Sequence, residues 1–208
     1  MRSKEIIIIG NGGHASVLTE ILLAQGEKIL GFTAPTVENN QFSLEYLGND
    51  EVILNYSTTD IELVLGVGMV GPASLRKNIF HCFNIQGYVF KNIIHPSAMI
   101  APSVIFGQGV QIMAGAIIQT NTKVADNTII NTGAVIDHDC HIEQDVHIAP
   151  GAKLSGNVHV RQGSHIGTGA TIIQGIEIGT NCLIGAGSVV VKSINSGVTA
   201  LGVPAKEV

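Results

Sequence analysis

The second half of the chain repeats one pattern every six residues. Each sixth residue from Ile94 to Val190 is bulky and apolar, in all seventeen cases. Neither the heptad of a coiled coil nor the alternation of a flat strand has this period, whereas hexapeptide repeats are typical of a parallel β-helix. Since three repeats complete one triangular coil, we expect residues 18 apart to stack along residues 94–194.

Two other positions of the repeat also favour a β-helix. Three residues after each apolar position stands Gly, Asn or Asp in fourteen cases, and Ser in the other three (Ser97, Ser103 and Ser193). Because Gly tolerates positive φ freely and Asn and Asp tolerate it best among the rest, we expect corners at these positions. One residue further on, a small side chain stands in fifteen of seventeen repeats, with Ile176 and Ile194 as exceptions, and should point inward.

The first 90 residues have a different pattern, in which short apolar runs alternate with helical periodicity. A buried strand at residues 5–9 leads into a glycine-rich turn and then into a helix that reaches Gly26. Further strands are predicted at 28–32, 61–65 and 87–90, a helix at 75–83, and a mobile loop at 34–50. Alternating strands and helices predict a small parallel sheet of Rossmann type. We therefore expect an α/β domain at residues 1–91 and a β-helix domain at residues 92–208.

Composition restricts the partners and the compartment. A net charge of −5 disfavours a nucleic-acid surface, although backbone amides at a helix N-terminus can still hold a small anion. The four Ile after Glu5 are too few for a signal sequence or a membrane span. Cys140 and Cys182 fall on inward positions of the repeat, so we expect no disulfide and a reducing cytoplasm.

The glycine-rich turn at residues 10–14 has two interpretations. It is either a tight connection between strand and helix, or a nucleotide site in which backbone amides approach phosphate groups. Dinucleotide sites carry an acidic residue after the second strand, and residues 31–35 contain none. A standard dinucleotide site is therefore not expected.

Four of the eight His occupy the sixth position of a repeat and should point outward. His141 should stack on His159 and His147 on His165, and we expect His159 and His165 to belong to a solvated ladder. A zinc site requires three or four converging ligands, and we expect no carboxylate in these columns. The sequence therefore predicts no metal.

His138 alone among the His occupies the third position of a repeat, beside a corner. Pro, Gln, Thr and Ala also occur at this position, so the fold itself does not require an imidazole, and we expect His138 to be catalytic. Asp139 either is only a corner residue or also holds the imidazole in one tautomer and raises its basicity. Cys140 is adjacent, but its inward position makes it a core residue rather than a nucleophile.

Four segments of the chain form a recognisable set: IIGNGGHA at residues 8–15, IHPSA at 94–98, INTGAVIDHD at 130–139 and GVPAK at 202–206. Together they resemble the family of sialic acid O-acetyltransferases and bacterial nucleotide-amino-sugar N-acetyltransferases. The repeat stretch is particularly similar to GDP-perosamine and UDP-4-amino sugar N-acetyltransferases. The resemblance implies a left-handed β-helix, a homotrimer, and acetyl-CoA as the acetyl donor.

The resemblance also implies roles for individual residues. It makes His138 the general base and Asp139 its neighbouring carboxylate. It places His147, Thr168 and Ala186 in contact with acetyl-CoA. It places the acceptor substrate in contact with five further residues, namely Gly12, Gly13, His14, Gly68 and Asn131. The sequence departs from the family at Thr33, where an acidic residue is usual, and at Met69, where Asp or Asn is common.

The expected function is N-acetylation of the 4-amino group of a nucleotide-linked 4-amino-4,6-dideoxy sugar, by direct attack without an acyl-enzyme. Two alternatives are O-acetylation of free sialic acid and a non-catalytic scaffold that senses a nucleotide. Because no loop interrupts the repeats, acceptor discrimination should depend on the N-terminal domain. Outward apolar residues, including Met113, Ile117 and Val135, agree with the implied trimer.

Overall fold

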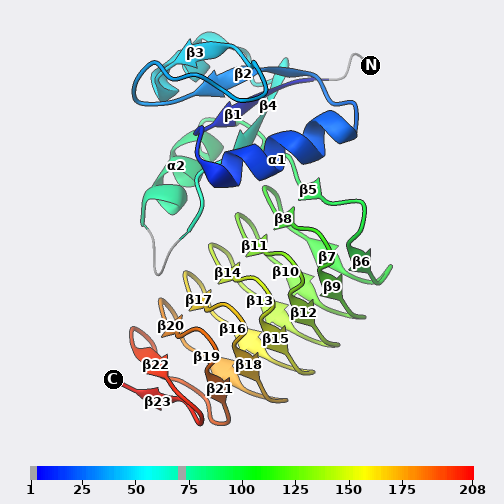
Figure 1. The fold of residues 1–208 in the computed structure, drawn as a ribbon, viewed down its shortest axis with the longest axis vertical. Coiled ribbons are helices and arrows are strands. Elements are labelled where there is room, and N and C mark those ends of the chain that lie inside the picture. The colour runs from blue at the N-terminus through cyan, green and yellow to red at the C-terminus, as the bar shows by residue number, and fades with distance from the viewer. Residues whose placement is uncertain (1–3, 70–73) are drawn as a thin grey trace. The chain divides into compact units, whose positions relative to one another are not determined.

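The computed structural model describes residues 4–69 and 74–208, which form two compact units (Figure 1). The first unit contains the described residues up to Gly68 together with Ser74–Ile93. The second contains Met69 and Ile94–Val208. No helix in the described part of the chain is long and apolar enough to cross a membrane.

The first unit is a parallel four-stranded sheet in the order β3-β2-β1-β4 with helical connections. Its elements are β1 (Glu5–Ile9), α1 (Gly13–Ala24), β2 (Ile29–Thr33), β3 (Tyr46–Gly48), the 3-10 helix η1 (Asp50–Asn55), β4 (Ile61–Leu65) and α2 (Ser74–Asn84). The run of Ile in β1 is fully buried because β1 is a central strand covered on both faces.

Two expectations for this unit were wrong. The segment predicted as a loop contains the edge strand β3, which pairs with the end of β2. Gly31 permits this pairing, since a Cβ there would meet the Glu45 carbonyl oxygen at 2.5 Å. The predicted strand at residues 87–90 is reduced to a single bridge between Phe90 and Leu63.

The second unit is a left-handed β-helix whose coils form three parallel sheets. The five-stranded sheet contains β7 (Ile105–Phe106), β10 (Lys123–Val124), β13 (His141–Ile142), β16 (His159–Val160) and β19 (Glu177–Ile178). The six-stranded sheet contains β6 (Met99–Ile100), β9 (Ile117–Ile118), β12 (Val135–Ile136), β15 (Lys153–Leu154), β18 (Thr171–Ile172) and β21 (Val189–Val190). The eight-stranded sheet contains β5 (Ile93–Ile94), β8 (Gln111–Ile112), β11 (Ile129–Ile130), β14 (His147–Ile148), β17 (His165–Ile166), β20 (Leu183–Ile184), β22 (Thr199–Leu201) and β23 (Lys206–Glu207), of which only β23 is antiparallel to its neighbour.

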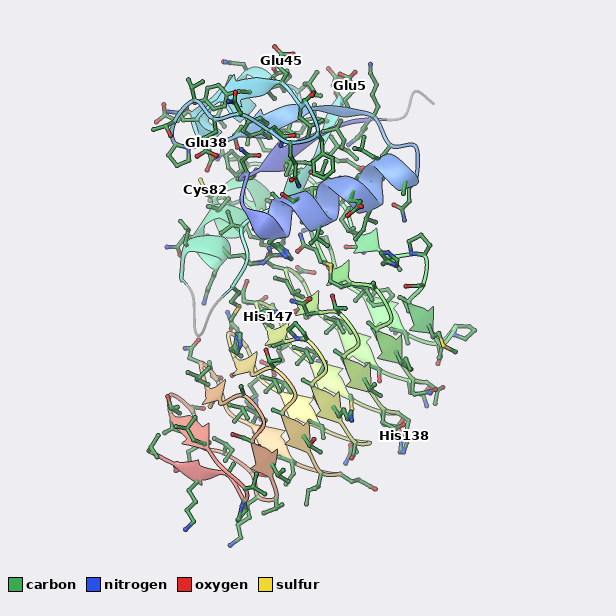
Figure 2. The ribbon with its side chains drawn as sticks, viewed as in Figure 1. Glu5, Glu38, Glu45, Cys82, His138 and His147 are labelled. Atoms are coloured by element: carbon green, nitrogen blue, oxygen red, sulfur yellow. The ribbon has the colours of Figure 1, made fainter. Side chains whose placement is uncertain are left out.

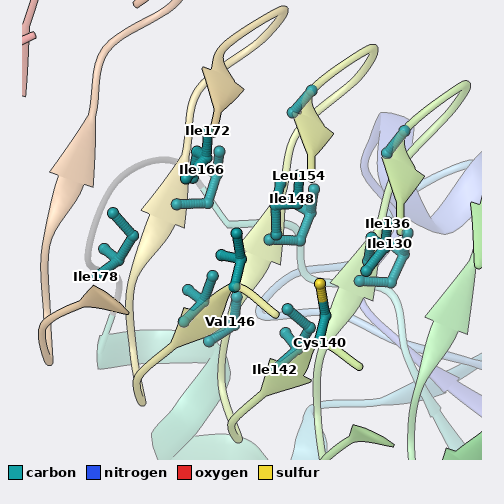
Figure 3. Packing of buried hydrophobic residues seen from close by; sticks show 14 of the residues in the cluster. Ile130, Ile136, Cys140, Ile142, Val146, Ile148, Leu154, Ile166, Ile172 and Ile178 are labelled. Atoms are coloured by element: carbon teal, nitrogen blue, oxygen red, sulfur yellow. The ribbon is translucent and has the colours of Figure 1, made fainter. Parts of the chain in front are cut away.

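Stacking at intervals of 18 residues is confirmed. His141, for example, pairs with Lys123 on one side and with His159 on the other. All fourteen Gly, Asn and Asp corners have positive φ, whereas the three Ser corners do not. The inner apolar residues fill one continuous core (Figure 3). Burying each Ile of this core contributes roughly 1.5–3 kcal/mol.

Candidate functional site

His138 lies at the corner between β12 and β13 and is bonded to Asp139. Its Nδ1 is 2.7 Å from Asp139 Oδ2, and both side chains are about half exposed. The other Asp139 oxygen accepts a hydrogen bond from Asn121 Nδ2 at 3.2 Å, one coil earlier. The carboxylate is therefore fixed on both sides, and it orients the imidazole.

This arrangement prepares His138 to accept a proton. The hydrogen bond to Asp139 raises the pKa of His138 above its usual value, with a further contribution from the charge of Asp137. In turn, the hydrogen bonds from His138 and Asn121 lower the pKa of Asp139, which therefore stays a carboxylate. A carboxylate can only accept, so Nδ1 carries the proton and Nε2 presents a lone pair. A half-exposed imidazole in this state can accept a proton from a bound molecule.

Gly156 provides the space for the His138 ring, and sequence reasoning missed it. Gly156 follows His138 by one coil in the same column, and a Cβ at this position would lie 2.5 Å from both Nε2 and Cε1 of His138. The repeat could have indicated the column, but not the direction in which the imidazole points.

Cys140 is a core residue, as predicted. Its side chain is 1% exposed, and Sγ approaches the Ser155 carbonyl oxygen at 3.3 Å. Burial raises the pKa of the Cys140 thiol to about 11. Since the thiolate is the nucleophilic form, Cys140 is poorly suited to form an acyl-enzyme.

A second cluster of site residues lies around His147 on β14. His147 is 7% exposed, and its Nε2 is 3.1 Å from the amide nitrogen of Asn131, the residue that follows β11. Its Nδ1 is 2.8 Å from the backbone oxygen of Met69, which belongs to the same unit. His147 and Asn131 therefore lie in direct contact.

Thr168 and Ala186 occupy the same corner of the triangular coil as Asn131. Asn131, Thr168 and Ala186 follow strands of the eight-stranded sheet, whereas His138 follows a strand of the six-stranded sheet. Both Thr168 and Ala186 are exposed, and the Thr168 carbonyl accepts from the N–H of Gly187 beside Ala186. Figure 2 shows His138 and His147 on opposite sides of the β-helix. One copy of the chain therefore does not bring these two His together.

The glycine turn joins β1 to α1 in the first unit. Gly12 is the N-cap of α1 without a side-chain cap, Gly13 begins the helix, and a Cβ on either would meet nothing within 4 Å. Gly68 lies beside His14, since its Cβ would be 3.5 Å from the His14 Cβ. The four residues thus surround an open helix N-terminus, which favours an anion.

A carboxylate reaches the end of β2 although the sequence has none there. Thr33 is fully buried, and its hydroxyl donates to Asp50 Oδ1 at 2.7 Å. Sequence reasoning missed Asp50 because it follows Thr33 by 17 residues. The expectation that this edge lacks an acidic group was correct for residues 31–35 but not for the folded edge.

The outward His stack in the expected pairs, but His159 and His165 are only partly exposed rather than fully solvated. His159 Nε2 donates to Glu143 Oε1 at 2.8 Å, and the His159 ring stacks on that of His141, with ring centroids 4.7 Å apart. Burial lowers the pKa of His165. A carboxylate does share a column, because Glu177 pairs with His159. Among the described residues, however, no group of three or more His, Cys, Asp or Glu is arranged to hold a metal ion.

Comparisons with known proteins match both units. The family model of the PglD N-terminal domain matches residues 5–83, and that of the bacterial transferase hexapeptide, with six repeats, matches residues 121–156. UDP-N-acetylbacillosamine N-acetyltransferase of Bacillus subtilis (strain 168) is 39% identical over 116 residues, which are 53% of this chain and 52% of that enzyme. This match thus spans about half of the length of that relative.

Two sets of solved structures cover the whole chain. The acetyltransferase domain of PglB from Neisseria gonorrhoeae FA1090, solved alone and with acetyl coenzyme A, is 34% identical, with a TM-score of 0.92 over 99% of this chain and 100% of that chain. A mutant of perosamine N-acetyltransferase from Caulobacter crescentus, in complex with CoA and GDP-perosamine, is 35% identical, with a TM-score of 0.91 over 100% of this chain and 98% of that chain.

Proposed function

Because the chain belongs to the family of hexapeptide-repeat sugar N-acetyltransferases with a PglD N-terminal domain, we propose that it acetylates the 4-amino group of a nucleotide-linked 4-amino-4,6-dideoxy sugar with acetyl-CoA. The observation that carries this proposal is the His138–Asp139 pair, with Nδ1 protonated and Nε2 free to accept a proton. The cysteine beside it is buried, which favours direct transfer over an acyl-enzyme.

In the proposed reaction the sugar amine attacks the thioester carbonyl of acetyl-CoA. The C–N bond forms, the C–S bond breaks, and His138 Nε2 accepts the proton that the nitrogen loses. That proton then passes to the departing thiolate, so the products are the acetamido sugar and CoA. Asp139 acts through His138, since it stabilises the imidazolium that forms.

The two units supply different parts of this function. The open N-terminus of α1, with Gly12, Gly13, His14 and Gly68, is suited to the diphosphate of the nucleotide sugar. In the second unit, Thr168 and Ala186 would contact the acetyl-CoA arm, and the Asn131–His147 cluster would lie where its acetyl group meets the acceptor. Three unpaired cysteines agree with a reducing compartment, and we place the enzyme in the cytoplasm.

We further propose that the chain works as a homotrimer whose active site is shared between copies. His138 and the Asn131–His147 cluster occupy different corners of one coil, so a site that uses both needs a second copy. Apolar side chains also remain exposed on the β-helix, including Met99 and Ile105 at 67% and 61% exposure. Met113, which was expected to contribute, is only 1% exposed, so that expectation was wrong.

A mixture of two strongly impaired variants tests the shared site. His138→Ala and Asn131→Ala chains, each with little activity alone, are expected to regain activity when unfolded together and refolded as mixed trimers. With equal amounts of the two chains, roughly a quarter of the interfaces would pair an intact His138 of one copy with an intact Asn131 of the next. Activity per chain and molecular mass in solution are the measurements. No recovery in mixtures of confirmed trimers would contradict a shared site, and a monomeric mass would contradict the trimer itself.

The pH profile tests the pairing of His138 with Asp139. Because His138 acts as a neutral base, kcat/KM should fall as the pH drops below its raised pKa. Asp139→Asn removes the main cause of that raised pKa, so the acid limb should move to lower pH, together with a loss of rate. Asn also tolerates the positive φ of this corner. Asp137→Asn is the matched control and should move the limb less; equal shifts would contradict a specific role for Asp139.

The acceptor is tested by following thiol release from acetyl-CoA. We expect the highest kcat/KM with UDP-, dTDP- or GDP-linked 4-amino sugars. A preference for free sialic acid would instead support the O-acetyltransferase alternative. No thiol release with any amino sugar or with sialic acid would instead favour the non-catalytic, nucleotide-sensing scaffold.

A further inference from the structure

His147 is the centre of a chain of hydrogen bonds that runs in one direction. The Thr132 backbone N–H lies 2.7 Å from Asn131 Oδ1, Asn131 Nδ2 lies 3.1 Å from His147 Nε2, and His147 Nδ1 lies 2.8 Å from the Met69 carbonyl oxygen. All three contacts lie within the second unit, and the central imidazole is almost fully buried.

The groups at the two ends of this hydrogen-bond chain determine where the protons of His147 and Asn131 lie. Met69 offers a carbonyl oxygen, which can only accept, so His147 Nδ1 must carry a proton. At the other end Thr132 offers an N–H, which can only donate, so the Asn131 oxygen faces Thr132 and its NH₂ group faces His147. In the neutral imidazole Nε2 then accepts from Asn131.

This arrangement leaves one N–H of Asn131 for a ligand. The Asn131 amide uses its oxygen on Thr132 and one N–H on His147, and no acceptor for the second N–H is found among the residues that the structure describes. The side chain is half-buried, at the same corner as Thr168, where the proposed function places the acetyl-CoA arm. A fixed amide N–H at this corner is suited to the carbonyl oxygen of a thioester.

We propose that Asn131, rather than His147, donates the hydrogen bond to the acetyl carbonyl, and that His147 is a positioning residue locked by the Met69 carbonyl. The proposal rests on the proposed acetyl transfer and assigns a different role to His147 from the direct thioester contact that the resemblance implies. It also explains how the chain functions with Met69 in place of Asp or Asn, because only the backbone of residue 69 takes part.

Two substitutions of His147 test the roles of its two ring nitrogens separately. Asn at position 147 can place an amide nitrogen near the site of Nδ1 but cannot reach Asn131. Gln is longer and can place its amide oxygen near the site of Nε2, where it can accept from Asn131. We expect Asn131→Ala and His147→Asn each to lower kcat by roughly 10²-fold, and His147→Gln to lower it less. The KM for acetyl-CoA should change little in all three variants.

A double-mutant cycle provides the decisive comparison, in which the two single variants and the double variant are each compared with the active wild-type enzyme. If both residues act through one donor, Asn131→Ala combined with His147→Asn should lose no more rate than the worse single variant. If the two losses multiply, His147 contacts the carbonyl independently and the proposal is overturned. Unchanged melting temperatures would show that the variants keep the fold.

The tautomer of His147 provides a second test that needs no substrate. In protein labelled with ¹⁵N-histidine, the imidazole signals that disappear in His147→Gln should belong to a ring protonated at Nδ1. A ring protonated at Nε2 would overturn the proposal. Because this experiment does not involve acetyl transfer, it separates an error in the hydrogen-bond network from an error in the proposed function.

Discussion

Replacing His138 with Ala or Asn is expected to lower kcat by roughly 10²–10⁴-fold while the β-helix stays folded. The loss follows from the geometry, since Nε2 is the only lone pair of a neutral imidazole that Asp139 holds through Nδ1. The fold should survive because the His138 side chain is 47% exposed and its removal leaves no buried cavity. The measurements are kcat with the preferred amino sugar and the melting temperature.

Cys140 provides the matched control for His138. It lies two residues away, and its thiol is a nucleophile that could in principle carry an acetyl group beside the base. Because the side chain points into the core and burial raises the pKa of its thiol to about 11, Cys140→Ala and Cys140→Ser should keep most of the activity. A folded but inactive Cys140→Ala enzyme would contradict direct attack and would indicate a covalent intermediate.

The β-helix could be predicted almost residue by residue, because each position of the repeat has one geometric role. A corner with positive φ accepts only a few residue types, so Asn121 and Gly133 identify corners without any tertiary information. The inward direction of Cys140 follows from the same register. For this reason the core, the stacking by 18 residues and the unusual place of His138 were all predictable.

Side-chain pairings between columns could not be predicted, because they depend on rotamers rather than on register. Glu143 reaches His159 across 16 residues, and Asp50 reaches Thr33 across 17. His147 was expected on an open face, but it is buried and bonded to Met69, a residue 78 positions earlier in the chain. The short strand β3 was missed for a related reason, since three residues at a sheet edge carry too little periodicity.

Replacing Gly156 with Ala is expected to lower kcat by about 10²-fold with little loss of stability, because a displacement of about 1 Å in a reacting group has an effect of this size. The new Cβ would lie 2.5 Å from His138 Nε2, so the imidazole must rotate away from Asp139. The backbone tolerates Ala, since Gly156 is not among the glycines with positive φ, and the half-exposed ring can move into solvent.

The control for Gly156 is Gln174→Ala, which places Ala one coil further along the same column, at an exposed position. This variant should keep its activity, so a loss confined to Gly156→Ala would be due to the displaced imidazole. The acid limb of kcat/KM should also move to lower pH in Gly156→Ala, because the hydrogen bond that raises the pKa of His138 would be lost. If Gly156→Ala kept both its rate and its pH profile, the position of the ring over Gly156 would not be the one in which His138 acts as a base.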